Sequence, residues 1–154
     1  MKRALAAVLA GCVWLVLPAG AAQAQPDPLA TLRQATVAFH DVGAAEDAGY
    51  QEFLPCFDSA TGGMGQHYVD LSRVDGIVEA GRPEAMVYQL GAEGRPHLVS
   101  VEYIVPDTFP RPTLYGQVFH HNTDLHLWVL HAWIWKANPA GVFADYNPDV
   151  PDCD

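Results

Sequence analysis

Lysine and arginine are scarce in this chain, which has 154 residues and carries 8 basic side chains against 18 acidic ones. The formal net charge at pH 7 is therefore −10. Nucleic acids and anionic lipid headgroups are bound largely through lysine and arginine, which supply positive charge to phosphates. The shortage of both residues argues against a DNA- or RNA-binding protein and against one that docks on an anionic membrane surface.

The sequence also lacks the short motifs of several common enzyme classes. No Gly-x-Ser-x-Gly motif surrounds its serines, no glycine-rich loop ends in Gly-Lys, and no Cys-x-x-Cys-His haem site is present. The tight zinc motif His-Glu-x-x-His is absent, as are internal repeats and low-complexity tracts. These absences favour a binding protein over an enzyme, and they assign no reaction.

Residues 1–24 have the pattern of a cleavable signal peptide. A basic start precedes an apolar run, and Ala22-Gln23-Ala24 has small residues where signal peptidase reads them, which predicts cleavage before Gln25. The run is shorter than the roughly 20 residues that cross a bilayer comfortably, so a membrane anchor is the less favoured alternative. The segment LAGC, ending at Cys12, resembles a lipoprotein cleavage box. Because more apolar chain follows it, a lipid anchor at Cys12 is also less favoured.

Cleavage would leave one domain, residues 25–154, that is secreted or periplasmic and contacts no membrane. Loss of Lys2 and Arg3 would shift the net charge from −10 to −12, with 6 basic residues left. An even number of cysteines in an oxidising compartment usually pairs, so we expect a disulfide between Cys56 and Cys153. Closing a loop of about 100 residues would stabilise the fold by roughly 4–5 kcal/mol. A two-cysteine metal or redox site is the weaker alternative, because no Cys-x-x-Cys is present.

The apolar pattern predicts two short N-terminal helices. Asp27 is placed to cap the first, with Pro28 at its first position and apolar residues at three- and four-residue spacing after it. The first helix should break near Gly43, and the second should end at Gly49. The segment that follows, residues 54–83, contains GGMG and is expected to be mostly loop.

Four strands are expected in the second half of the chain. Residues 84–90 and 97–106 should form one hairpin, and residues 115–121 and 125–136 a second, each joined by turn-forming residues. The expected architecture is α+β, with a four-stranded antiparallel sheet, the N-terminal helices on one face and long loops on the other.

Two histidines, His126 and His131, lie in the most apolar stretch of the chain. Strand alternation places His131 in a row with Val129 and Trp133, where it should be buried, whereas His126 lies near the start of the strand. A buried imidazole needs a hydrogen-bond partner, because leaving the bond unmade costs about 1–3 kcal/mol. A purely structural role for His131, with a carbonyl or carboxylate as its partner, therefore stays open.

His67 and Glu102 provide His131 with potential partners. Glu102 lies among apolar residues in the middle of an expected strand, where a carboxylate must be exposed, paired or used. Two imidazoles and a carboxylate with one open position suit zinc, copper or another divalent first-row ion. We therefore predict a metal site of His67, His131 and Glu102. Glu84 is a further candidate ligand, or else a solvated or capping carboxylate.

A non-catalytic ligand site is the main alternative. Met64, Tyr103, Trp133 and Trp135 would line an aromatic slot for a small apolar or cell-wall molecule, with His67 and His131 as orienting donors. The pair His120-His121 is assigned to the surface, because adjacent strand residues point to opposite faces and should not line one pocket.

Four segments of the chain resemble a family of small exported bacterial proteins. They are GGMGQHYVD, RPEAMVYQ, LVSVEYIVP and LHAWIWKANPAGVFADYNPDV, within residues 62–150. Members carry GMGxHYV, RPEALVY, a V-E-Y strand, and LHxWxWKxNPxGxFAxxNP followed by a terminal cysteine. The resemblance marks the same polar residues and the same two cysteines as those named above, and it supplies no activity. Asp70 departs from it, since an asparagine is usual there.

Overall fold

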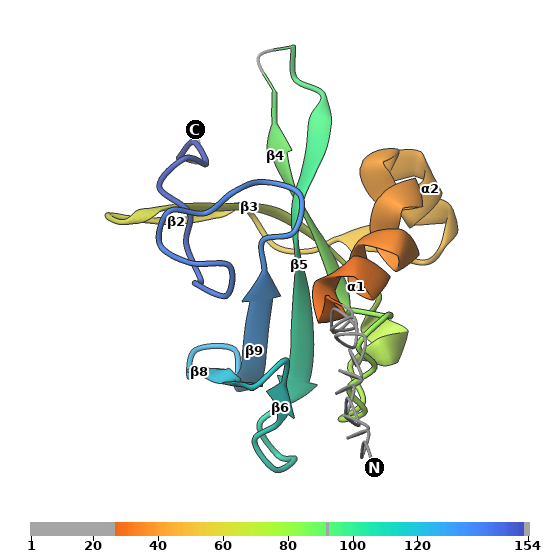
Figure 1. Cartoon of the computed structure of the whole chain (residues 1–154), viewed down its shortest axis with the longest axis vertical. Coiled ribbons are helices and arrows are strands. Elements are labelled where there is room, and N and C mark those ends of the chain that lie inside the picture. The colour runs from red at the N-terminus through yellow and green to blue at the C-terminus, as the bar shows by residue number, and fades with distance from the viewer. Residues whose placement is uncertain (1–26, 92, 153–154) are drawn as a thin grey trace, which may run out of the picture.

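The structure is a computed structural model that describes residues 27–91 and 93–152. The expected signal peptide, Cys12 and Cys153 lie outside the described residues. The fold belongs to the α+β class, with an N-terminal helical segment and a mainly antiparallel sheet (Figure 1). The sheet has seven strands, so the expectation of four was too low.

The helical segment begins as its capping residues predict. Helix α1 (Pro28–Thr36) starts after Asp27, whose carboxylate accepts a hydrogen bond from the Leu29 backbone N–H at 2.9 Å. A 3-10 turn (Val37–His40) follows α1. Asp41 then caps the short helix α2 (Val42–Asp47). Within the described residues, no helix is both long enough and apolar enough to span a bilayer.

The main sheet has the strand order β1-β3-β4-β5-β9-β8, and β2 pairs with β3 beside this path. Its strands are β1 (Gln51–Glu52), β2 (Phe57–Ser59), β3 (Gly62–Val69), β4 (Ala85–Leu90), β5 (Pro96–Pro106), β8 (His120–Asn122) and β9 (Leu127–Ala132). A 3-10 turn (Leu71–Arg73) follows β3, and β6 (Thr113–Leu114) and β7 (Gln117–Val118) form a separate hairpin. Both predicted hairpins, β4–β5 and β8–β9, are confirmed, the second with shorter strands.

The glycine-rich segment is strand β3 and not the expected loop. The glycines serve close backbone approach rather than flexibility, because a β-carbon at Gly62 would collide with the Asn147 carbonyl and one at Gly65 with the Tyr88 carbonyl. Gly65 also has a φ of 98°, which disfavours other residues. Sequence reasoning could not separate these two uses of glycine.

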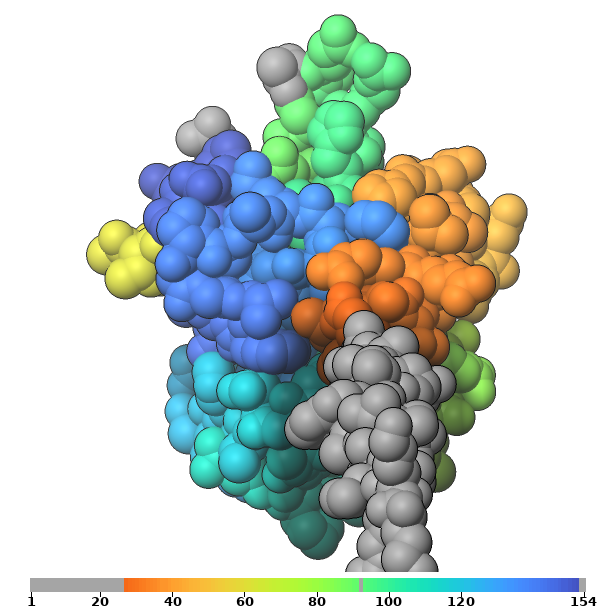
Figure 2. All heavy atoms as spheres, in the orientation of Figure 1, coloured from red at the N-terminus to blue at the C-terminus, as the bar shows by residue number. Residues whose placement is uncertain are grey.

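The C-terminal tail holds β3 in place. Gly63 of β3 forms a β-bridge with Asn147 of the tail. The backbone N–H of Trp133, just after β9, donates to the backbone carbonyl of Val142 at 2.9 Å. Figure 2 shows the tail in blue, forming the surface between the β2–β3 turn in yellow and the N-terminal helices in orange. Cys56 and Asp152 both line one pocket. The disulfide itself stays a prediction.

The two faces of the sheet differ in character. The face toward α1 and α2 carries the main apolar core, which includes Leu32, Tyr50, Met86, Tyr88, Val101, Tyr103 and Leu130. The opposite face lies under β2 and the tail, and it carries the buried polar residues His67, Glu102 and His131. A register shift at Val87/Tyr88 turns Leu98 to the helix face and Val99 to the other, the reverse of simple alternation.

Candidate metal centre

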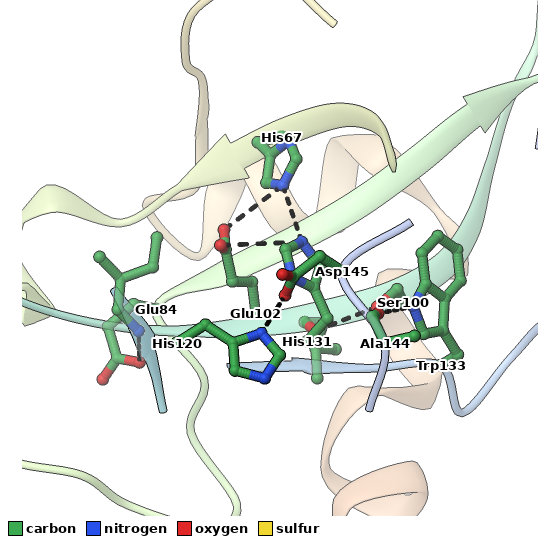
Figure 3. Close-up of polar contacts among 11 residues, drawn as sticks. His67, Glu84, Ser100, Glu102, His120, His131, Trp133, Ala144 and Asp145 are labelled. Carbon is green, nitrogen blue, oxygen red and sulfur yellow. Dashed lines mark hydrogen bonds and ion pairs between the residues drawn. The ribbon is translucent and has the colours of Figure 1, made fainter. Parts of the chain in front are cut away.

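Three strands bring His67, Glu102 and His131 to one face of the sheet. Glu102 on β5 pairs directly with His131 on β9, so both side chains point the same way. His67 lies on β3, with β4 between it and Glu102. The β4 residue beside Glu102 is Ala85, which has a small side chain. Figure 3 shows the His67 ring pointing toward Glu102 and His131.

The donor atoms of these residues form a compact triangle. His67 Nε2 lies 3.4 Å from His131 Nε2 and 3.3 Å from Glu102 Oε2, while His131 Nε2 lies 3.7 Å from Glu102 Oε1. A tetrahedral ion with bonds of about 2.1 Å separates its ligand atoms by about 3.4 Å. The three side chains are 5%, 7% and 1% exposed, in chain order. The buried triangle therefore has the dimensions of one face of a zinc-type coordination sphere.

The hydrogen bonding of the two rings also fits a metal. The Nε2 atoms face each other at 3.4 Å, well beyond the usual 2.9–3.0 Å of a nitrogen hydrogen bond. Both Nδ1 atoms are buried without a hydrogen-bond partner among the described residues. Direct contacts within the protein thus satisfy these imidazoles poorly, whereas a cation between the Nε2 atoms would use both lone pairs.

The electrostatics make His67 a ready ligand. Burial and the neighbouring His131 together lower the pKa of His67 to about 3. The ring is therefore neutral near pH 7, which is the form that binds metal.

His131 and Glu102 behave as a coupled pair. Burial disfavours charge on both, and it raises the pKa of Glu102 against the attraction of His131. Burial lowers the pKa of His131, but the carboxylates of Glu102 and Asp145 outweigh it, so that pKa is raised overall. Because each residue's charge affects the other, the two titrate as a coupled pair. A metal ion would have to displace any proton that this pair holds.

Sequence reasoning missed Asp145 and its contact with His120. Asp145 Oδ1 lies 3.7 Å from His131 Nδ1 and 2.7 Å from His120 Nδ1 (Figure 3). At 3.7 Å, Asp145 forms an ion-pair contact with His131 and no hydrogen bond. In many metal sites, a carboxylate hydrogen-bonded to the far nitrogen of a ligating histidine fixes the ring orientation and tautomer. Asp145 lies in the irregular tail, where no periodicity marks its direction. His120 and His121 are both exposed, as their assignment to the surface predicted. Both also border the pocket described below, which that prediction had excluded.

The other predicted residues lie apart from the triangle. Glu84 is buried, but its Oε2 accepts a hydrogen bond from the Ile104 N–H at 3.0 Å, and it is outside the metal-ligand cluster. Burial raises its pKa to about 7. His126 is exposed, as expected, with an 80% accessible side chain beside Asp107.

The structure does not assemble the predicted aromatic slot. Trp133 is stacked against the His131 ring and donates to the Ala144 carbonyl at 2.7 Å. Tyr103 and Trp135 belong to the helix side, where they donate to the Ala80 carbonyl and to Thr36 Oγ1. Among the four slot residues, Met64 alone lines the pocket with His67. The register shift in the β2–β3 pairing and the φ of Gly65 place it there.

A pocket of about 300 Å³ opens above the triangle. His67 and Glu102 line it, whereas His131 lies behind them. Its walls combine apolar residues with polar ones, among them His120, Asp124 and Asp145. A metal held by the triangle would thus be accessible from this pocket.

No protein-family model, curated protein or solved structure matches this chain. The site's geometry and chemistry therefore carry the functional argument.

Proposed function

We propose that this protein binds one divalent metal ion through His67, Glu102 and His131. The observation that carries the proposal is the buried triangle, in which one nitrogen from each histidine and a carboxylate oxygen all lie within 4.8 Å of one another. Buried polar groups of this kind are costly unless they are paired or coordinate a metal. Three protein ligands with one position left open are typical of accessible zinc sites.

The donor set favours zinc or copper over calcium or magnesium. Imidazole nitrogen suits first-row ions late in the series, whereas calcium and magnesium prefer sites built from oxygen alone. Glu84 is not assigned as a ligand, since its carboxylate is engaged by the β5 backbone.

We further propose that the metal is bound outside the cytoplasm. The signal-like residues 1–24 and the resemblance to small exported proteins support this location, and the acidic composition is compatible with capturing cations. The role would be to sequester or sense metal in the cell envelope. A purely structural role for the cluster is the competing hypothesis.

Zinc titration by calorimetry tests the site and its electrostatics together. We expect one zinc per chain at pH 7.5, with proton release, because both raised pKa values favour protonation of the Glu102–His131 pair and the metal must displace any proton that it holds. Affinity should rise with pH until the pH passes the raised pKa of His131, and His67 should add no dependence above about pH 3. Measuring the binding heat in two buffers of different ionisation enthalpy gives the proton number.

Glu102→Gln and His126→Ala form a matched pair for this titration. The first removes a ligand with little change in volume and should weaken zinc binding at least about 100-fold. The second removes an exposed histidine outside the triangle and should change nothing. Zinc binding below 0.1 equivalents per chain in the native protein would refute the site. Equal zinc affinity of the two variants would also refute it.

A further inference from the structure

The pocket over the candidate metal centre is larger than metal capture requires, and it has a continuous apolar part. Its volume of about 300 Å³ is about twice the 150 Å³ of an engineered cavity that holds benzene. Apolar side chains form about half of its lining, among them Phe53, Leu54, Phe57, Met64, Ile104 and Leu125. A site that only sequestered an ion would need no such wall.

The pocket and the metal donors share two residues. His67 and Glu102 belong to both, whereas His131 is 1% exposed and lies behind the pocket floor. Any coordination position that the chain leaves unfilled is therefore reached through this pocket. A ligand in the pocket could bind the metal with one end and contact the apolar wall with the other.

Two leucines are held at the mouth of the pocket with much of their surface exposed. Leu54 is 42% exposed and Leu125 is 39% exposed. Leu54 has a φ of 60°, a conformation that bulky residues rarely adopt. Its carbonyl accepts a hydrogen bond from Gln66 Nε2 at 2.7 Å, which fixes this turn against β3. The backbone at Leu54 thus adopts a conformation that leucine disfavours, and it holds the apolar side chain at the rim of the pocket.

Charge limits the kind of head group that fits. Two neutral imidazoles, one carboxylate and a divalent ion leave one net positive charge at the metal. Asp124 and Asp145 at the pocket wall oppose any highly charged anion. The site therefore favours a neutral or singly negative donor and disfavours phosphate.

We propose that this pocket binds a small molecule with one metal-coordinating donor atom on an apolar body about the size of an aromatic ring. This inference rests on the proposed metal site and deepens it. The ligand coordinates the open position of the metal while its apolar body lies between Leu54 and Leu125.

Cobalt(II)-loaded protein tests the inference, because visible absorption reports both metal occupancy and a change of ligand. At pH 8 we expect 4-phenylimidazole to bind at least about tenfold more tightly than imidazole, since burial of its ring adds apolar contact. Inorganic phosphate at the same concentrations should leave the spectrum unchanged.

Leu54→Asn removes part of the wall with a residue that tolerates the left-handed backbone. It should reduce the preference for 4-phenylimidazole to below about threefold, while Leu71→Asn, at a residue 63% exposed and outside the pocket, keeps it. Cobalt occupancy with equal binding of the two imidazoles, or an unchanged preference in Leu54→Asn, would overturn the pocket inference alone. Absence of cobalt binding would instead overturn the metal site.

Discussion

Replacing the whole triangle with apolar residues is expected to stabilise the metal-free protein while abolishing metal binding. In the variant His67→Leu/Glu102→Met/His131→Leu, three poorly satisfied polar groups leave the protein interior. Exchange of a buried charge cluster for apolar residues of similar volume often raises stability by 1–4 kcal/mol. We expect a gain of about this size in the free energy of unfolding, measured by urea denaturation in the presence of a chelator.

The free energy of unfolding of the triple variant distinguishes a metal-binding site from a cluster that only stabilises the fold. If the triangle served only to fix the core, the triple variant would lose stability or fail to fold cooperatively. The exposed site His126 supplies a matched control, because His126→Leu should change the free energy of unfolding by less than about 0.5 kcal/mol. A loss of more than about 1 kcal/mol in the triple variant would contradict the metal proposal.

Removing His131 alone should have the opposite effect. His131→Ala leaves Glu102 buried without its imidazole partner, and breaking a buried pair in this way costs about 3–5 kcal/mol. Because burial raises the pKa of Glu102, the folded variant holds this carboxyl's proton more tightly than the unfolded chain does. The electrostatic loss should be absent below the unfolded pKa of about 4.3 and grow as the pH rises through the raised folded value.

Urea denaturation of His131→Ala at pH 4.5 and pH 8 measures this effect. The stability of His131→Ala relative to His131→Ala/Glu102→Gln, which leaves the same cavity without a titrating carboxyl, should fall between pH 4.5 and pH 8. His126→Ala should lose no stability relative to the native protein at either pH. An equal difference at the two pH values would mean that the pKa of Glu102 is the same in the folded variant and in the unfolded chain, and burial would then not penalise its charge.

The sequence predicted the site better than it predicted the path of the chain. The three residues of the cluster could be named because a carboxylate and two histidines stand out against apolar neighbours, and because alternation in the last strand places His131 correctly inside the core. Their meeting point could not be derived. It depends on β3 joining the sheet beside β4, and the glycines there were interpreted as a loop.

Other errors have similar physical causes. Tyr103 and Trp135 were grouped with the histidines by composition, but alternation and the end of β9 send them to the helix face. The role of Asp145 depends on how an irregular tail crosses the sheet, and no periodic pattern encodes that crossing. The sequence thus did not predict long-range strand pairing or the course of irregular segments, whereas it predicted the local helix cap and the hairpin turns correctly.

The most direct test of the central claim is X-ray absorption spectroscopy of the zinc-loaded protein. We predict a first shell of nitrogen and oxygen at about 2.0–2.2 Å, with outer-shell scattering from two imidazoles that falls to one in His67→Ala. A spectrum without imidazole scattering, or one that His67→Ala leaves unchanged, would show that zinc is not held between these two rings.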